Sequence, residues 1–257
     1  MADYWRNRVA VVTGASTGIG AEVCVTLANN GMVVIGLARR ANLIEALNER
    51  VTGIGRIYGL ECDLTDTSSI LKTFEHIKEK FYVVHLLVNG AGRTVANFLL
   101  ESSAGEVKDV FDLNVIATCT CIMQSVELMK LHGLRSHIII INSILGHRVL
   151  ELPKPAFNVY PATKHALTAL CQTVRQEIRY NKLNVKLTSI SPGMVETDFL
   201  KVYNPASYAP IPKLQPKDVA DAVLYALHTP PTVQIEEIIL QAIPEHESPN
   251  KKEEKEE

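Results

Sequence analysis

Short, unbroken runs of apolar residues alternate along the chain with longer stretches that carry apolar residues on one helical face. The runs are rich in β-branched residues and predict strands covered on both faces of a sheet, where no polar position is needed. Strands are expected at Val9–Val12, Val33–Leu37, Arg56–Leu60, Val84–Val88, Ile138–Asn142, Val185–Ile190 and Ile235–Leu240. Helices are expected at Ile19–Asn30, Leu43–Val51, Ser68–Lys80, Gly105–Leu131, Ala162–Tyr180 and Pro216–Leu227.

This alternation predicts the fold class. Strand–helix–strand units form parallel sheets with right-handed crossovers. We therefore expect a doubly wound (Rossmann) α/β domain, with a central parallel sheet of about seven strands and helices on both faces. No repeat or linker divides the chain, so one domain is expected over 1–248, followed by a charged, disordered tail at 249–257. The long segment 192–215 follows a strand's carboxyl end and is interpreted as a substrate-binding loop.

Composition narrows the possible functions. The chain has 257 residues, is 47% hydrophobic and carries a formal charge of −2. These values suit a large core and give no electrostatic reason to bind nucleic acid or an anionic membrane. Without a membrane-spanning run or a signal-like start, we expect a cytoplasmic protein. The five cysteines are scattered, and Cys119 and Cys121 point apart on a helix, so buried reduced thiols are expected rather than a metal site.

A glycine-rich turn follows the first predicted strand and opens the first long helix. Glycines permit a tight turn and close approach of a ligand, and a helix N-terminus offers unpaired N–H groups to a pyrophosphate. A plain strand-to-helix turn is the alternative interpretation. We predict a dinucleotide site whose binding residues in this turn are Gly14, Ser16, Thr17, Gly18, Ile19 and Gly20.

The end of the second predicted strand indicates which dinucleotide binds. An NAD-binding domain usually has a carboxylate here for the ribose 2′-hydroxyl. This chain has Ala38 instead, followed by Arg39 and Arg40. Arginine suits a 2′-phosphate, so we predict NADP(H); a solvated arginine pair is the alternative.

Turns after the third, fourth and sixth predicted strands are further candidates for cofactor contacts. An aspartate after the third strand could accept from the adenine amine, or could equally cap a helix or turn. Small residues after the fourth strand allow close passage, and the turn after the sixth offers backbone groups and a hydroxyl to a carboxamide, although Pro-Gly marks any turn. The candidates are Asp63, Leu64, Asn89, Gly90, Pro192, Gly193, Val195 and Thr197.

Tyr160 and Lys164 are four residues apart in a predicted helix and therefore lie on one face. A nearby ammonium favours the phenolate, so we expect the pKa of Tyr160 to fall from about 10 towards neutrality. Ser143, at a strand end, could hold a substrate oxygen. Asn114 interrupts an apolar helix and is either a satisfied core amide or a link in a proton path. His147 is interpreted as a loop residue, or as one that supports the site residues without touching the substrate, rather than as a catalytic one.

Taken together, these motifs resemble the short-chain dehydrogenase/reductase family. The resemblance rests on Thr-Gly-x-x-x-Gly-Ile-Gly, Asn-x-Ala-Gly, the helix asparagine, the serine, Tyr-x-x-x-Lys and Pro-Gly, in that order. It implies that Tyr160 is the general acid/base and that Ser143 orients the substrate. It also implies that Lys164 binds the nicotinamide ribose and lowers the tyrosine pKa, and that Asn114 holds a water of the proton relay. The chain departs from the family at Gly90, where a second asparagine is usual.

Three shorter stretches, Gly-x-Ala-Arg, Asn-Ser-x-x-Gly-His-Arg-Val and Ser-Pro-Gly-x-Val-Glu-Thr, resemble a cytosolic NADP-dependent subgroup that includes farnesol dehydrogenases and short hydroxysteroid or carbonyl reductases. This resemblance implies a homo-oligomer built through the fourth and fifth helices. An apolar substrate wall favours a hydrophobic alcohol or carbonyl compound such as farnesol. The alternatives are a broad carbonyl or hydroxysteroid reductase, or a non-catalytic NADP-sensing module. The expected wall comprises Leu150, Phe157, Met194, Phe199, Leu200, Tyr203 and Tyr208.

Overall fold

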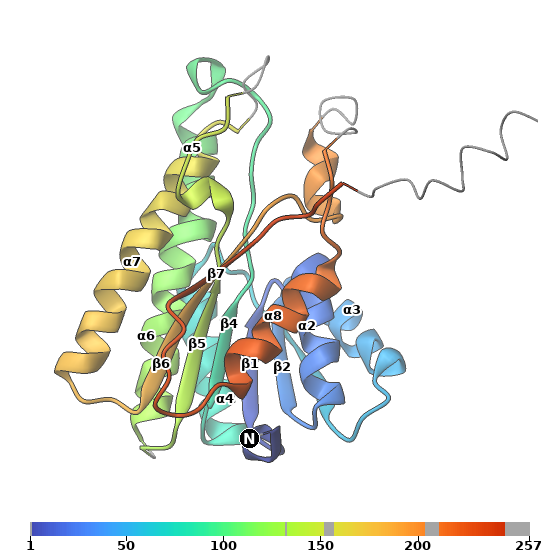
Figure 1. Ribbon diagram of the computed structural model, residues 1–257, viewed down its shortest axis with the longest axis vertical. Coiled ribbons are helices and arrows are strands. Elements are labelled where there is room, and N and C mark those ends of the chain that lie inside the picture. Colours follow the sequence, from blue (N-terminus) through green and yellow to red (C-terminus); the bar gives the residue numbers. More distant parts are fainter. Residues whose placement is uncertain (1, 132, 152–156, 204–210, 245–257) are drawn as a thin grey trace, which may run out of the picture.

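The computed structural model is a parallel sheet with helices packed on both faces (Figure 1). It describes residues 2–131, 133–151, 157–203 and 211–244. Within these residues seven strands lie in the order β3-β2-β1-β4-β5-β6-β7, and every neighbouring pair is parallel. The predicted doubly wound fold is confirmed. The strands are β1 (Val9–Thr13), β2 (Val33–Ala38), β3 (Arg56–Glu61), β4 (Leu86–Asn89), β5 (Ser136–Ile141), β6 (Val185–Pro192) and β7 (Glu237–Leu240).

The helices form two layers. Those that contribute to one apolar cluster, α2 and α8, cover one face of the sheet, and α4, α6 and α7 cover the other (Figure 1). The helices are α1 (Ala2–Trp5), α2 (Gly18–Asn29), α3 (Ala41–Glu45), α4 (Thr67–Phe81), α5 (Ala104–Phe111), α6 (Ala117–Lys130), α7 (Tyr160–Tyr180) and α8 (Pro216–His228). Short 3-10 segments lie at Ala46–Arg50, Leu99–Glu101, Ile144–Gly146 and Asp198–Val202.

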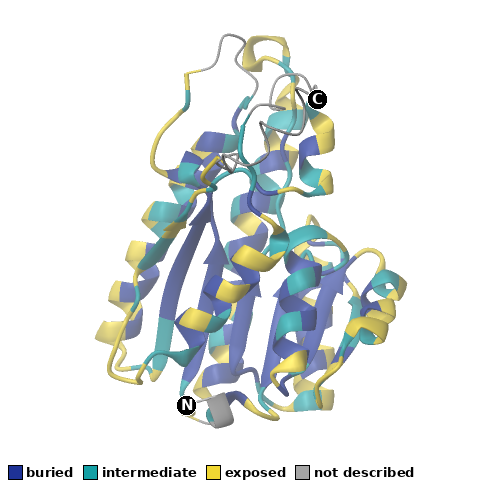
Figure 2. Cartoon of the chain, turned by 45° about the vertical axis from the view of Figure 1, so that its right-hand side comes forward, coloured by how far each residue is buried: buried dark blue, intermediate teal, exposed yellow. Residues whose placement is uncertain are grey.

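The unbroken apolar runs are explained by burial on both faces. In β1, Ala10 and Val12 pack in the cluster of α2 and α8, whereas Val9 and Val11 pack in the cluster of α4, α6 and α7. All five residues of the strand are buried. Figure 2 shows the strands as the buried centre of the molecule and the outer helix faces as exposed.

The expected helix Gly105–Leu131 is interrupted. A π-helical segment, Asp112–Ile116, separates α5 from α6. Such a segment inserts one extra residue into the helical repeat, which the apolar pattern does not reveal. The expected strand Ile235–Leu240 begins later, at Glu237. The reason is that the N–H and the carbonyl of Leu187 are bonded to the side-chain amide of Gln234, at 3.3 and 2.7 Å, instead of to a strand.

The expected helix Leu43–Val51 is also shorter and irregular. Its α-helical part ends at Glu45, and the chain continues as a 3-10 segment. Asn48 explains the end, because its side chain bonds both the N–H and the carbonyl of Ile57 on β3, at 3.0 and 2.8 Å. These bonds fix the segment against the edge strand.

Helix α1 has no counterpart in the predictions. Trp5 is 3% exposed, and its indole N–H donates to the carbonyl of Leu227, at the end of α8, over 2.9 Å. The hydroxyl of Tyr4 donates to the carbonyl of Arg135 over 2.7 Å. The start of the chain is thereby fastened to segments that come much later in the sequence.

The cysteines are free, and four of the five are buried, whereas Cys119 is partly exposed. Among the residues that the structure describes, no three His, Cys, Asp or Glu side chains are placed to hold a metal ion together. The described helices include none with the length and hydrophobicity that a membrane crossing requires.

Candidate active site

A cavity of about 890 Å³ opens at the carboxyl ends of the strands. The strand-end turns that the sequence singled out converge on it, as expected for a parallel sheet. Gly20, Asn89 and Asn114 do not line it but lie behind its walls. The site residues expected from sequence that do line it are Gly14, Ser16, Thr17, Gly18, Ile19, Arg39, Arg40, Asp63, Leu64, Gly90, Ser143, Tyr160, Lys164, Pro192, Gly193, Val195 and Thr197.

The glycine-rich turn is shaped for close approach. Gly14 and Gly18 have φ values of +68° and +58°, a region that favours glycine. A Cβ on Gly20 would lie 2.3 Å from the carbonyl oxygen of Gly14, so the turn has no room for a side chain there. Helix α2 begins at Gly18, and the side chain of its N-cap, Thr17, makes no capping hydrogen bond. Its first N–H groups therefore remain available, and the turn fits a phosphate group.

Thr13 supports the turn after β4, where the family's second asparagine is replaced. Its hydroxyl accepts the N–H groups of Gly90 at 3.1 Å and Ala91 at 3.2 Å. The same hydroxyl lies 3.4 Å from Oδ1 of Asn89, which is buried. A Cβ on Gly90 would lie 3.0 Å from the carbonyl of Thr13. The turn is therefore held by the threonine hydroxyl and has little room for a larger residue.

The two arginines after β2 are exposed at the rim of the cavity. Asp63, after β3, accepts hydrogen bonds from the hydroxyl and the N–H of Thr65, at 2.7 and 2.9 Å. These bonds, with a smaller contribution from the charge of Arg39, hold the pKa of the Asp63 carboxyl below its usual range. Asp63 thus serves as a turn-capping residue in this structure while also lining the cavity.

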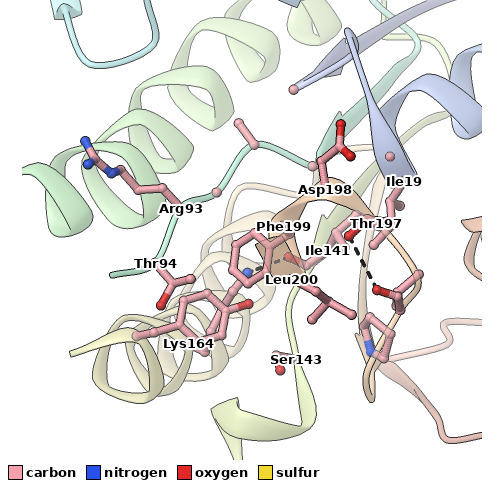
Figure 3. A pocket seen from close by; sticks show the side chains of 18 of the residues that line it. Ile19, Arg93, Thr94, Ile141, Ser143, Lys164, Thr197, Asp198, Phe199 and Leu200 are labelled. Atoms are coloured by element: carbon pink, nitrogen blue, oxygen red, sulfur yellow. Dashed lines mark hydrogen bonds between the residues drawn. The ribbon is translucent and has the colours of Figure 1, made fainter. Parts of the chain in front are cut away.

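Tyr160 is the first residue of α7, and Lys164 lies one turn further along. The Lys164 ammonium donates to the carbonyl of Ile141, at the end of β5, over 2.9 Å and lies 5.5 Å from the centre of the Tyr160 ring. Ser143 follows β5, and its hydroxyl lies close enough to Tyr160 to lower the pKa of the phenol. In Figure 3, Ser143, Ile141 and Lys164 lie around the same part of the cavity, and a dashed line marks the hydrogen bond from Lys164 to Ile141. The structure therefore brings Ser143, Tyr160 and Lys164 together, as the sequence indicated.

The expected ionisation of this pair is wrong for the protein alone. Burial raises the pKa of Tyr160 well above its ordinary value, and the nearby Tyr203 adds to the increase, while the Ser143 hydroxyl opposes it. Burial also lowers the pKa of Lys164 to about 8. Helical spacing reveals that two residues are neighbours, but it does not reveal how far their polar atoms are removed from water.

Asn114 lies in the π-helical segment and is 1% exposed. Its Oδ1 accepts the N–H of Arg93 at 2.8 Å, and its Nδ2 donates to the carbonyl of the same residue at 2.9 Å. Nδ2 also donates to the hydroxyl of Thr163, which bonds the carbonyl of Tyr160 at 2.7 Å. The side-chain amide is therefore satisfied, and it ties the turn after β4 to the start of α7.

Aromatic residues enclose the Tyr160 end of the cavity. The Phe199 ring lies 5.4 Å from that of Tyr160, and Phe157 meets Tyr203 edge-on at 6.0 Å. The Tyr203 hydroxyl is 2.8 Å from that of Thr94, so the segment after β6 is bonded to the segment after β4. Leu150, Met194 and Leu200 also line the cavity, whereas Tyr208 lies outside the described residues.

Sequence reasoning missed seven polar residues that line the cavity: Thr65, Arg93, Thr94, Asn142, Arg148, Asp198 and Gln241. Arg93 pairs with Asp109 on α5, and in Figure 3 its side chain extends away from Ser143. Thr94 follows the Asn-x-Ala-Gly motif closely, and that proximity was the available signal for it.

The order of the sheet, the glycine-rich turn and the cluster of Ser143, Tyr160 and Lys164 are those of an oxidoreductase with a doubly wound fold. The family model for short chain dehydrogenase matches residues 8–207, and the chain belongs to that family. It is 40% identical over 247 residues to farnesol dehydrogenase of Aedes aegypti, covering 95% of this chain and 99% of the relative. It is also 40% identical over 247 residues to dehydrogenase/reductase SDR family member 11 of Homo sapiens, covering 92% and 94%.

Solved structures agree with the fold. An alcohol dehydrogenase from the archaeon Thermococcus sibiricus, complexed with 5-hydroxy-NADP, superposes with a TM-score of 0.80 at 25% identity. The match covers 94% of this chain and 99% of that one.

Proposed function

We propose that the protein is an NADP(H)-dependent oxidoreductase that transfers a hydride between nicotinamide and a hydrophobic alcohol or carbonyl compound, with farnesol as the favoured substrate. The observation that carries this proposal is the cluster of Ser143, Tyr160 and Lys164 at one end of a cavity whose other end has the phosphate-fitting turn. The relationship to a farnesol dehydrogenase over nearly the whole chain supports the choice of substrate.

In this proposal the cofactor lies along the turns after β1 to β6. The N–H groups at the start of α2 would bind its pyrophosphate, and Arg39 and Arg40 would bind the 2′-phosphate. Ala38 supports NADP over NAD because it places no carboxylate against that phosphate. The backbone of Pro192, Gly193 and Val195, with the Thr197 hydroxyl, would hold the carboxamide. The NADP analogue in the archaeal alcohol dehydrogenase supports the same choice.

When bound, the nicotinamide supplies or takes the hydride. For reduction, the hydroxyl of Tyr160 donates its proton to the substrate oxygen while the hydroxyl of Ser143 holds that oxygen in place. For oxidation, Tyr160 must be a phenolate, which takes the proton from the substrate hydroxyl as the hydride leaves. Its raised pKa keeps Tyr160 protonated in the protein alone, which is the form that reduction requires. Lys164 would orient the ribose, and Asn114 would keep the start of α7 in register with the turn after β4.

The substrate end of the cavity supports an apolar ligand. Phe157, Phe199, Leu200 and Tyr203 contribute its wall, and segment 192–215 is proposed to be the substrate-binding loop. The remaining assignments, proposed on the resemblance to the subgroup, are a single cofactor domain over 1–248, a homo-oligomer and a cytoplasmic location. The proposed tail at 249–257 lies outside the described residues.

The test is an absorbance assay at the wavelength of the reduced cofactor, with NADP or NAD and a panel of isoprenoid, steroid and quinone substrates. Tyr160→Phe should lower kcat at least a hundredfold without changing NADPH affinity. Tyr180→Phe, at the exposed end of α7, is the matched control and should behave as the wild type. Turnover of a steroid but not of farnesol would favour the hydroxysteroid or carbonyl reductase. Tight NADPH binding without turnover of any substrate would favour the sensing module.

A further inference from the structure

His147 belongs to a hydrogen-bonded cluster behind the cavity. Its Nε2 lies 2.7 Å from Oε1 of Glu237, on β7, and the same oxygen lies 2.6 Å from the hydroxyl of Ser191. Ser189 approaches that oxygen at 3.4 Å. A carboxylate only accepts hydrogen bonds, so the imidazole and the two hydroxyls all donate to one oxygen of Glu237.

This cluster fixes one end of the turn that carries Ser143. The turn begins where the N–H of Asn142 donates to the carbonyl of Ile190, on β6, over 2.7 Å. It ends at His147, after the 3-10 segment, where the imidazole reaches Glu237. Both ends of the turn are therefore held against neighbouring strands. The first is held by the main chain, and the second by the His147 imidazole, whose shorter contact is to Glu237 and whose longer one, at 3.4 Å, is to the Ser191 hydroxyl.

We propose that Glu237 is a positioning residue for Ser143, acting through His147. This inference rests on the proposed function, in which the Ser143 hydroxyl holds the substrate oxygen. Among the described residues that line the cavity, neither Glu237 nor His147 appears, so the carboxylate acts on the reaction only through the turn.

Other contacts restrict what the loss of Glu237 would change. The hydroxyl of Thr168 donates to the carbonyl of Gly146 over 2.9 Å, which keeps the turn against α7. The N–H of Gly193 donates to the carbonyl of Leu240 over 2.7 Å, which holds the proposed carboxamide site to β7 independently. Removing the Glu237 carboxylate should therefore displace Ser143, while the proposed cofactor site and the start of α7 stay in place.

The main variant is Glu237→Leu, with Glu237→Gln as the conservative variant that keeps an acceptor oxygen. Small displacements of a reacting group reduce rates steeply, so Glu237→Leu should lower kcat about tenfold. NADPH affinity should stay within twofold of the wild type, and Glu237→Gln should restore most of kcat. Glu236→Leu is the matched control. Glu236 precedes Glu237 in the sequence, but its carboxylate pairs with Arg175 at 3.5 Å, so its loss leaves the cluster intact.

His147→Leu provides a second route, because it breaks the same link and leaves the bond between Glu237 and Ser191 in place. The Glu237→Leu/His147→Leu double variant should lose no more kcat than either single variant, which is the sign of one shared path. Wild-type kcat in both single variants, or a loss of kcat that only follows a loss of NADPH binding, would overturn the inference.

The proposed function can be refuted independently of the positioning role of Glu237. If Ser143→Ala and Tyr160→Phe retain wild-type turnover, the catalytic assignment is wrong. If these two variants are inactive while Glu237→Leu and His147→Leu turn over normally, only the positioning role is wrong.

Discussion

Replacing Lys164 with methionine should make the cofactor-free protein less dependent on pH. Lys164 is 4% exposed, and burial lowers its pKa from an ordinary value of 10.5 to about 8. At about 1.4 kcal/mol per pKa unit, this difference means that the buried ammonium costs the folded state about 3 kcal/mol below pH 8. Methionine has a similar length and carries no charge, so it removes that cost.

The substitution also removes a hydrogen bond. The carbonyl of Ile141, which accepts from the ammonium over 2.9 Å, would be left without that donor, at a cost of about 1–3 kcal/mol. The two effects partly cancel near neutral pH, so the absolute stability of Lys164→Met should lie within about 2 kcal/mol of the wild type. The change of this stability difference with pH is the more informative measurement, because it depends more on the charge of Lys164 than on the lost hydrogen bond.

The sign of that dependence follows from the two pKa values. Between pH 8 and 10.5 the unfolded state binds more protons at Lys164 than the folded state, so the wild type gains stability as the pH rises. Relative to Lys164→Met, its free energy of unfolding should rise by about 3 kcal/mol over that interval. Urea denaturation without cofactor at several pH values measures this, and Lys72→Met, on the exposed side of α4, controls for the loss of a lysine. A constant difference, or one that falls with pH, would refute the assigned cost of burial.

Three further outcomes are expected. Ala38→Asp with Arg39→Leu should shift the preference from NADP towards NAD by at least about tenfold in kcat/KM, because one charge-assisted bond contributes about 1.5–3 kcal/mol; a wild type that already prefers NAD would contradict this. Without cofactor, Tyr160 should show no phenolate absorbance near neutral pH, which a titration of the wild type against Tyr160→Phe can check. Gly20→Ala should weaken NADPH binding and lower the melting temperature, since its Cβ would meet a backbone carbonyl at 2.3 Å. Gly105→Ala in exposed α5, where the nearest atom is at 3.8 Å, should do neither.

Much of the fold could be predicted from the sequence because the sheet is buried on both faces. Such strands appear as continuous apolar runs, and their order along the chain together with crossover handedness leaves few arrangements. The strand-end motifs then necessarily meet at one edge, so the residues around the cavity could be found before any coordinates. The boundaries of shorter elements, such as Ala46–Arg50 and β7, depended on side-chain bonds that the apolar pattern does not contain, and neither α1 nor the π-helical segment was predicted.

The features that could not be predicted depend on contacts between distant segments. The bond between Thr94 and Tyr203 joins residues 109 positions apart, and each of them alone is an ordinary polar residue. Asn114 was an ambiguous buried amide until the π-helical segment placed it against Arg93. The pKa of Tyr160 was predicted to fall, whereas burial raises it, and burial is a property of the whole fold.

The attachment of Trp5 to α8 has a consequence for synthesis on the ribosome. Its indole is made near the beginning of translation, but the carbonyl that it binds is made 222 positions later. The side chains of α2 that share a cluster with α8 are likewise made long before α8 is. The first half of the sheet therefore emerges before the helix that closes its core, and it is exposed to proteases and to aggregation in the interval. Delays in translation before α8 should accordingly reduce the yield of folded protein more than equal delays after it.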